Sequence, residues 1–254
     1  YQTDYRNSVW NCGILPVYRQ QLYSVYGEYK STAREFFATV NLTHNREWYN
    51  RIYEQRIENG QVQRVSLPLS NHGSGYTVKS TLSKGFYDLG LKTSLMALLN
   101  ISKAEQISGG QRLPYQYRLM RLEPKVIWTP NRHWETSYQT DIRYGGSKIG
   151  ERTRLAPLWN VIQQVQLSYI FSPIEASLSV DHYHNDVNED QSVNAVFADF
   201  SVSWKSGRWQ ITATATNLFD KRTYAYTRYA SLESYTSWVR IRPREFLVAI
   251  RYRL

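Results

Sequence analysis

Alternation of apolar and polar residues with a period of two runs through most of this chain and limits what it can fold into. Between residues 196 and 205, every even position is apolar or aromatic and most odd positions are polar. The segments 209–216 and 246–254 alternate in a similar way. Successive side chains of a β-strand point to opposite faces. Each segment is therefore expected to be a strand with one apolar face and one more polar face.

Eleven segments of the chain show this pattern, and several of them reach ten residues or more. A strand in a soluble protein averages about 5–6 residues, whereas a tilted strand that crosses a membrane needs about 9–11. The chain is therefore expected to be all-β, made of antiparallel transmembrane β-barrel strands. The expected strands cover residues 20–30, 36–44, 76–82, 89–100, 114–128, 134–144, 159–171, 174–184, 196–205, 209–216 and 246–254.

The connections between these segments alternate in length, and aromatic residues flank each short turn. Short turns on one side and long loops on the other are typical of outer-membrane barrels, with the short turns in the periplasm. The aromatic residues indicate an interfacial girdle at that rim. Short turns are expected near residues 31–32, 85–86, 130–131, 172–173 and 206–207, and long extracellular loops at 49–73, 103–113, 145–158, 185–193 and 217–240.

The overall charge and the cysteine content narrow the function classes. The formal net charge is +10, but the basic residues are scattered, with no block of roughly five like charges and no nucleic-acid-binding motif. The charge therefore indicates a surface that faces solvent or lipopolysaccharide, and no nucleic-acid partner is expected. Cys12 is the single cysteine, so no disulfide can form within the chain.

Motifs that carry catalysis are missing from the sequence. It contains no serine elbow, no metal-binding helix motif and no glycine-rich phosphate loop. His182 and His184 could share a metal ion with Asp186 or Asp190, but both histidines continue the apolar face of residues 174–180. They are expected at the membrane interface instead. We therefore predict no enzyme activity, no catalytic residue, no metal site and no cofactor.

Two groups of residues are candidates for contacts with a ligand or a plug domain. Polar residues that alternate with the apolar positions would line the lumen, and Lys92, Arg143, Asp181 and Asp199 are candidates among them. Aromatic residues in or beside the long loops could stack on a ligand or form the outer aromatic girdle. The candidates there are Trp48 and Tyr226. The other expected lumen-facing residues are Gln139, Asp141, Gln164, Gln166 and Arg251.

The last forty residues resemble the C-terminal end of TonB-dependent outer-membrane receptors, especially those of Bacteroidetes. The resemblance is carried by the sequence TNLFDKRTY at 216–224, followed by IRPREF at 241–246 and the closing strand. It implies a 22-stranded barrel filled by a plug domain. It also implies import of a scarce nutrient, such as an iron chelate, cobalamin or a glycan, across the outer membrane. Energy would come from an inner-membrane protein that acts on the plug, and a surface lipoprotein is an implied partner.

On this interpretation, residues 1–254 are the C-terminal portion of an outer-membrane barrel that contacts the lipid bilayer and lipopolysaccharide. Residues 1–19 are expected to be an extracellular loop, and no plug domain is expected in the chain. Residues 20–30 and 244–254 would pair with remaining barrel strands outside it. Alternatively, residues 1–10 add a twelfth strand, and the chain is a self-contained passive channel or translocator. A third alternative is an outer-membrane adhesin.

Overall fold

The protein is described here from a computed structural model. It covers residues 7–10, 13, 15–58, 61–150, 153–187, 190–230 and 233–253. The described chain is nearly all β, which confirms the expected fold class. Cys12 and Leu254 lie outside the described residues.

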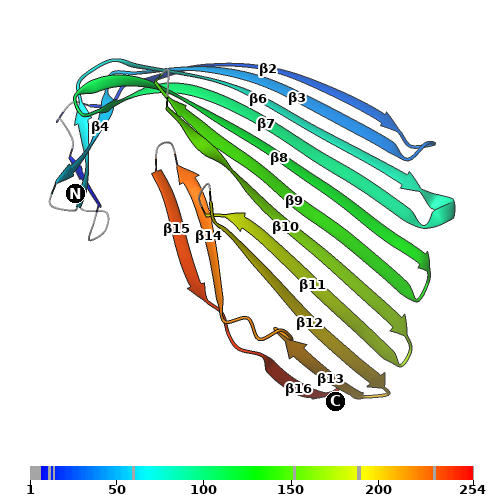
Figure 1. Cartoon of the computed structure of the whole chain (residues 1–254). Coiled ribbons are helices and arrows are strands. Elements are labelled where there is room, and N and C mark those ends of the chain that lie inside the picture. Colours follow the sequence, from blue (N-terminus) through cyan, green and yellow to red (C-terminus); the bar gives the residue numbers. More distant parts are fainter. Residues whose placement is uncertain are drawn as a thin grey trace.

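Eleven long strands form one curved antiparallel sheet, and each pairs with the next one along the sheet (Figure 1). Each of the eleven expected segments falls on one of them, so the predicted strand count is confirmed. The strands are β2 (Tyr18–Ser31), β3 (Phe36–Tyr49), β6 (Asn71–Phe86), β7 (Leu91–Ser108), β8 (Gln111–Asn131), β9 (Trp134–Ile149), β10 (Thr153–Phe171), β11 (Ile174–Asp186), β12 (Ser192–Ser206), β13 (Trp209–Thr216) and β16 (Glu245–Tyr252).

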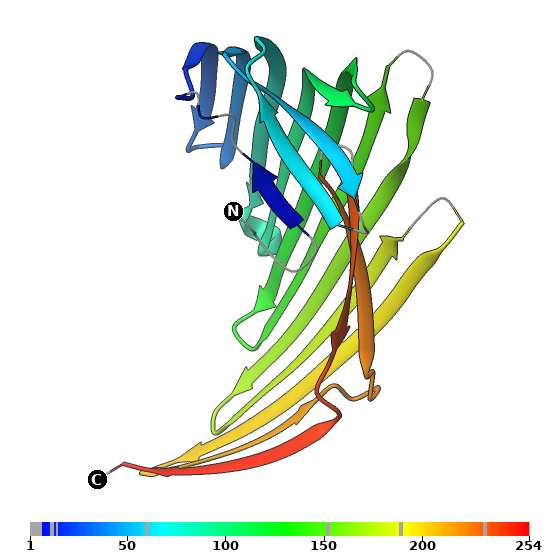
Figure 2. The same ribbon diagram turned by 90° about the vertical axis from the view of Figure 1, so that its left-hand side faces the viewer.

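Five shorter strands lie outside this series. One precedes β2, two lie between β3 and β6, and two lie between β13 and β16. β4 (Ile52–Glu58) and β5 (Gln61–Leu67) form a hairpin, and β1 (Asn7–Trp10) pairs with β5 in parallel. β14 (Thr223–Ala230) and β15 (Glu233–Arg240) form a second hairpin with its own two-stranded sheet. Both hairpins lie on the concave side of the large sheet (Figures 1 and 2). The expected loop over 1–19 thus includes β1 and the first residues of β2.

Two of the expected long loops are wrong. Residues 103–113 continue β7 and β8 as paired strands up to a tight turn at Gly109 and Gly110, whose φ angles are 58° and 75°. Within 145–158, β9 runs to Ile149 and β10 begins at Thr153. Backbone pairing persists in both segments although the regular alternation of apolar and polar residues has stopped. A hydropathy pattern carries no signal for a strand of that kind.

The cross-strand register assigns each side chain to a face. Tyr224 of β14, on the concave side, contacts the ring of Tyr183 in β11 at 5.2 Å between centroids. Odd positions of β11 therefore face the concave side, and its even positions, including Leu178, face the convex side. Leu178 pairs with Phe200 of β12 and with Leu167 of β10. The convex face is accordingly apolar, with many large side chains exposed on it.

The two edges of the large sheet stay open among the described residues. β2 pairs only with β3, and β16 pairs only with β13. Residues 7–10 pair with β5 and not with β16, while residues 1–6 lie outside the described part. Apart from strands, the described residues form one short 3-10 helix, η1 (Tyr87–Leu89). None of the helical residues described belongs to a helix long and apolar enough to cross a membrane.

Candidate functional site

The concave face forms a continuous polar wall. Its composition follows from the alternation, because each position between two apolar convex residues points inward. The rows run across several strands: Gln139 of β9 pairs with Gln164 of β10, which pairs with Asp181 of β11. Pairing of this kind places all the expected lumen residues on one face, namely Lys92, Gln139, Asp141, Arg143, Gln164, Gln166, Asp181, Asp199 and Arg251.

An ion-pair network occupies the middle of this wall on β8 and β9. The Arg121 guanidinium donates to both Asp141 oxygens, from Nε at 3.0 Å and from Nη2 at 2.9 Å. Arg143 donates to the same carboxylate from Nη2 at 2.6 Å, and Arg121 also pairs with Glu123. Two cations thus balance two anions in a fixed arrangement. Arg143, one of the candidate contact residues, is therefore already paired with Asp141 within the wall.

A basic hollow lies on the wall nearer the short turns. It has a volume of about 390 Å³ and is lined by Lys92, Lys125, Phe37 and Ser94, among others. Neither the Lys92 nor the Lys125 ammonium has an ion-pair partner within the part of the chain that the structure describes. An ammonium group acts as a point charge with three donors. The hollow can therefore accept a carboxylate or another anion from the lumen side.

The β14–β15 hairpin packs on the wall through an aromatic cluster. The Tyr224 ring lies edge-on to Tyr183 and at 6.5 Å from Phe197, and Asn185 donates its side-chain amide to the Tyr224 hydroxyl. Burial raises the pKa of the Tyr224 hydroxyl. Ala225, the next residue in β14, is fully buried. The hairpin is thus attached to the concave wall, where it covers part of β11 and β12.

The root of this hairpin is held by Asn217, which follows β13. Its side-chain amide donates to the carbonyls of Lys221 and Arg242, both at 2.8 Å, and its side-chain oxygen accepts the Lys221 N–H at 3.0 Å. Its backbone N–H donates to Asp199 Oδ1 at 2.7 Å. Asn217 has a φ of 51°, a conformation that asparagine tolerates better than most residues. We call this arrangement the Asn217 latch.

Asp220 adds a second tie at the same root. Its carboxylate forms two hydrogen bonds with the Arg222 guanidinium, at 3.0 and 2.9 Å, and accepts the backbone N–H of Arg244 at 3.0 Å. The hydrogen bond from Arg222 and that from Arg244 hold the pKa of Asp220 below its ordinary value. The residues that carry the family resemblance therefore join the end of β13 and the root of the hairpin to the start of β16.

The six candidate contact residues separate into distinct locations. Lys92 lies in the basic hollow, and Arg143 belongs to the ion-pair network. Asp181 is two residues before Tyr183 in β11, so the two are neighbours on the same face. The Tyr226 ring is 6.1 Å from that of Tyr224. These residues share the concave side with Asp199, which serves the Asn217 latch. Trp48 stands apart, because its pairing with His72 places it on the convex face.

Sequence reasoning did not single out the aromatic cluster on β11 and β12. Tyr183 and Phe197 occupy positions that the alternation assigns to the polar face. Their rings contact each other at 5.6 Å and together receive Tyr224. An aromatic residue at a polar-face position was the available signal for a contact with another element. The alternation could not say which element that would be.

The histidines considered for a metal site face the convex side. His184 Nε2 lies 3.3 Å from Asp186 Oδ1, and the ring of His182 is 3.4 Å from the side-chain oxygen of Gln163. Asp186 also accepts the backbone N–H of Trp159 at 2.8 Å. Within the described ranges, no group of three or more histidine, cysteine or acidic residues could hold a metal ion.

Comparison of the chain with protein-family models, with curated proteins and with solved structures finds no match. The resemblance to TonB-dependent receptors stays a prediction from the residues of the C-terminal segment.

Proposed function

We propose that this chain forms part of the wall of a TonB-dependent outer-membrane receptor that imports a scarce nutrient, such as an iron chelate, cobalamin or a glycan. The observation that carries the proposal is the amphipathic curved sheet. Its convex face is apolar, its concave face is polar and charged, and a hairpin from a long connection packs onto the concave face. A sheet of this kind suits lipid on one side and a lumen on the other.

The dimensions of the convex face support placement in a membrane. Near the short turns, Trp134 of β9 packs on Tyr169 of β10 at 4.6 Å between ring centroids. Toward the long-connection end, Tyr144 of β9 packs on Trp159 of β10 at 4.7 Å. Ten residues of β9 separate these pairs, about 33 Å along the strand. A tilt of about 40° reduces this to roughly 25 Å, the height of the apolar band between aromatic girdles.

The open edges support a larger assembly of strands. In lipid, each unpaired backbone group costs several kcal/mol, so an exposed strand edge is not tolerated. The outer edges of β2 and β16 have no partner strand among the described residues. We propose that other barrel strands pair with both edges and that a plug fills the concave side. Energy for import would come from an inner-membrane protein acting through the plug.

Cysteine labelling on cells tests the orientation. In a Cys12→Ser background, Trp238→Cys reports strand β15 of the hairpin, where Trp238 is 72% exposed, and Thr32→Cys reports a short turn. An impermeant thiol reagent should label the first variant on intact cells and the second only after the outer membrane is ruptured. The opposite pattern would reverse the proposed topology, and equal labelling of both variants would argue against membrane insertion.

A gene deletion tests the transport role. The deletion strain should lose growth on one limiting iron chelate, cobalamin source or glycan, and the wild-type gene should restore it. Uptake of that nutrient should stop when the inner-membrane proton gradient is collapsed. Uptake that persists without the gradient would favour a passive channel, and unaltered uptake of every nutrient would favour an adhesin.

A further inference from the structure

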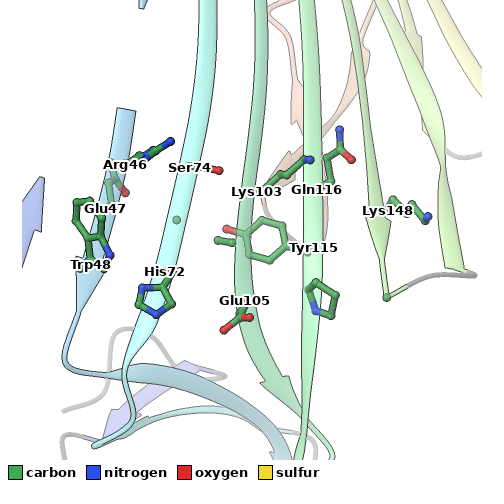
Figure 3. A pocket seen from close by; sticks show the side chains of 14 residues that line it. Arg46, Glu47, Trp48, His72, Ser74, Lys103, Glu105, Tyr115, Gln116 and Lys148 are labelled. Carbon is green, nitrogen blue, oxygen red and sulfur yellow. The ribbon is translucent and has the colours of Figure 1, made fainter. Parts of the chain in front are cut away.

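A row of basic side chains crosses the convex face near the end of the strands opposite the short turns. The register joins five residues on neighbouring strands β3, β6, β7, β8 and β9 into one line, and Figure 3 shows them side by side. Three are cations and none is acidic. In order across the sheet they are Arg46, Ser74, Lys103, Gln116 and Lys148.

This basic row borders a hollow of about 510 Å³. Farther from the apolar band, Trp48, His72, Glu105 and Pro114 line the same hollow (Figure 3). Neighbouring strands are about 4.8 Å apart, so the two lysines lie roughly 10 Å from one another across β8. The site is therefore wide enough for a group larger than a single inorganic ion.

The cations of the row are available to bind. Neither Lys103 nor Lys148 has an ion-pair partner in the described ranges of the chain. Arg46 donates from Nε to His44 at 3.2 Å, which orients its guanidinium. Glu105, the acidic residue nearest the lysines in the lining, is paired with Arg112 at 3.2 Å. Glu47 also contributes a carboxylate to the lining and accepts hydrogen bonds from the hydroxyls of Tyr18 and Tyr49. Three cations and two carboxylates leave the hollow with a net positive charge.

The position of the row relative to the apolar band indicates its ligand. One residue pair closer to the band, the rings of Tyr23, His44 and Tyr76 stack in a line, with centroids 6.2 and 4.2 Å apart. Aromatic rings of this kind mark the level of lipid headgroups. The basic row begins directly beyond them. At the end of β11, by contrast, the convex face holds the His184–Asp186 pair, so the positive charge is local.

We propose that this convex hollow binds the phosphate groups of a phosphorylated glycolipid of the outer leaflet. Lys103 and Lys148 would each donate to a phosphate oxygen, as lysine does when it acts as a point charge for phosphate. Arg46 would add a guanidinium, and Trp48 would supply a ring against which a sugar can stack. The inference rests on the proposed membrane orientation of the convex face and deepens it by naming a lipid partner.

Binding of purified lipopolysaccharide to the detergent-solubilised full-length protein tests this site. The double variant Lys103→Gln/Lys148→Gln should bind at least tenfold more weakly, because each lost charge-assisted hydrogen bond is worth about a factor of ten. The control Lys30→Gln/Lys79→Gln removes two lysines from the concave face, outside both hollows, and should bind as the wild type does. Dephosphorylated glycolipid should bind the wild type about as weakly as phosphorylated glycolipid binds the double variant.

Two outcomes would overturn the proposal. Equal binding by both double variants would show that the convex lysines do not hold the lipid. Competition by inorganic phosphate at equal concentration would show a simple anion site instead of a lipid site. Insertion into liposomes is measured in parallel for every variant. Normal insertion with unchanged lipid binding contradicts this inference alone, whereas failure of the wild type to insert contradicts the proposed function.

Discussion

The two faces of the large sheet are made by the same strands but are stabilised differently. On the convex face, Leu178 pairs with Phe200 across β11 and β12, and the Phe200 side chain gains little from the protein alone because it is 41% exposed. On the concave face, Asp141 is held by two arginines and Asp199 by the backbone of Asn217. The convex face depends on its surroundings, whereas part of the concave face is held by internal polar contacts.

The largest expected effect comes from a charge on the convex face. Val202 on β12 pairs with Ala176 and Ala213. Leu95→Arg on β7 should reduce the free energy of unfolding in liposomes by about 2–4 kcal/mol, the cost of a charge near the bilayer midplane. Val202→Arg should cost less, because Val202 lies four residues from the end of β12 at the short turn. Denaturant titrations of the full-length protein in liposomes measure both changes.

The control for the Val202 substitution is the neighbouring residue on the other face. Ser201→Arg places the same charge on the concave side and loses one hydrogen bond with Ser177, worth about 1 kcal/mol. The difference between the Val202 and Ser201 variants isolates the environment of each face. Equal destabilisation by the two substitutions would contradict the assignment of lipid to the convex side.

A smaller effect is expected when the Asn217 latch is removed. Asn217→Ala deletes three side-chain hydrogen bonds at a position that is 7% exposed, which should cost about 1–3 kcal/mol. Part of that cost arises from the positive φ, which alanine adopts poorly. Asn217→Gly removes the same hydrogen bonds, but glycine adopts a positive φ without strain. Hydrogen exchange should show faster exchange of β14 and β15 amides in both variants, and wild-type protection in the glycine variant would refute the latch.

The ion-pair network should contribute less than the latch. Asp141→Asn leaves Arg121 and Arg143 facing each other, but their side chains are 35% and 46% exposed. Solvent screens such groups, so the expected loss is roughly 1 kcal/mol or less, and it should shrink at high salt. A double-mutant cycle with Arg143→Gln measures the coupling. A loss that is large and independent of salt would show that the wall is drier than its exposure indicates.

The smallest expected effect concerns the pH dependence of Asp220. Because its folded pKa is below the ordinary value, its stabilising contribution is complete above that ordinary value and is lost as the pH falls through the lowered pKa. Hairpin amide exchange, corrected for intrinsic rates, should therefore be unchanged between about pH 5 and 8 on this account, since carboxyl groups are ionised there. Asp220→Asn should remove the low-pH dependence. Loss of protection near pH 6 would point to another group.

The strands of the sheet were predictable because one face of each is apolar. The segment 196–205 shows this clearly, and β12 covers it. The alternation failed at residues 103–113, where isolated apolar residues such as Ile107 do not mark one face, although β7 and β8 stay paired there. It also could not predict the Asn217 latch, because Asn217 contacts groups 18 and 25 residues away in the sequence. Contacts of that kind depend on how the hairpin folds back, which a local pattern does not encode.

The candidate contacts show the same limit. Lys92, Arg143, Asp181 and Asp199 were chosen for facing inward, and the register confirms that facing. The sequence did not show that Asp199 and Arg143 would be engaged by Asn217 and Asp141. Trp48 was chosen as a loop aromatic, yet it belongs to β3 and faces the convex side. The reason is that β3 extends to Tyr49, five residues beyond the end of the expected strand at residue 44.

The odd number of strands in the large sheet has a consequence for symmetry. In an antiparallel sheet of eleven strands, β2 and β16 run in the same direction. A second copy of the chain, rotated about an axis parallel to the strands, would present β2 beside β16 with the same polarity. The ladder between the two copies would be parallel, so a twofold assembly cannot close as an antiparallel cylinder. Closure requires an odd number of additional strands between β16 and β2, so copies of this sheet alone cannot form the cylinder.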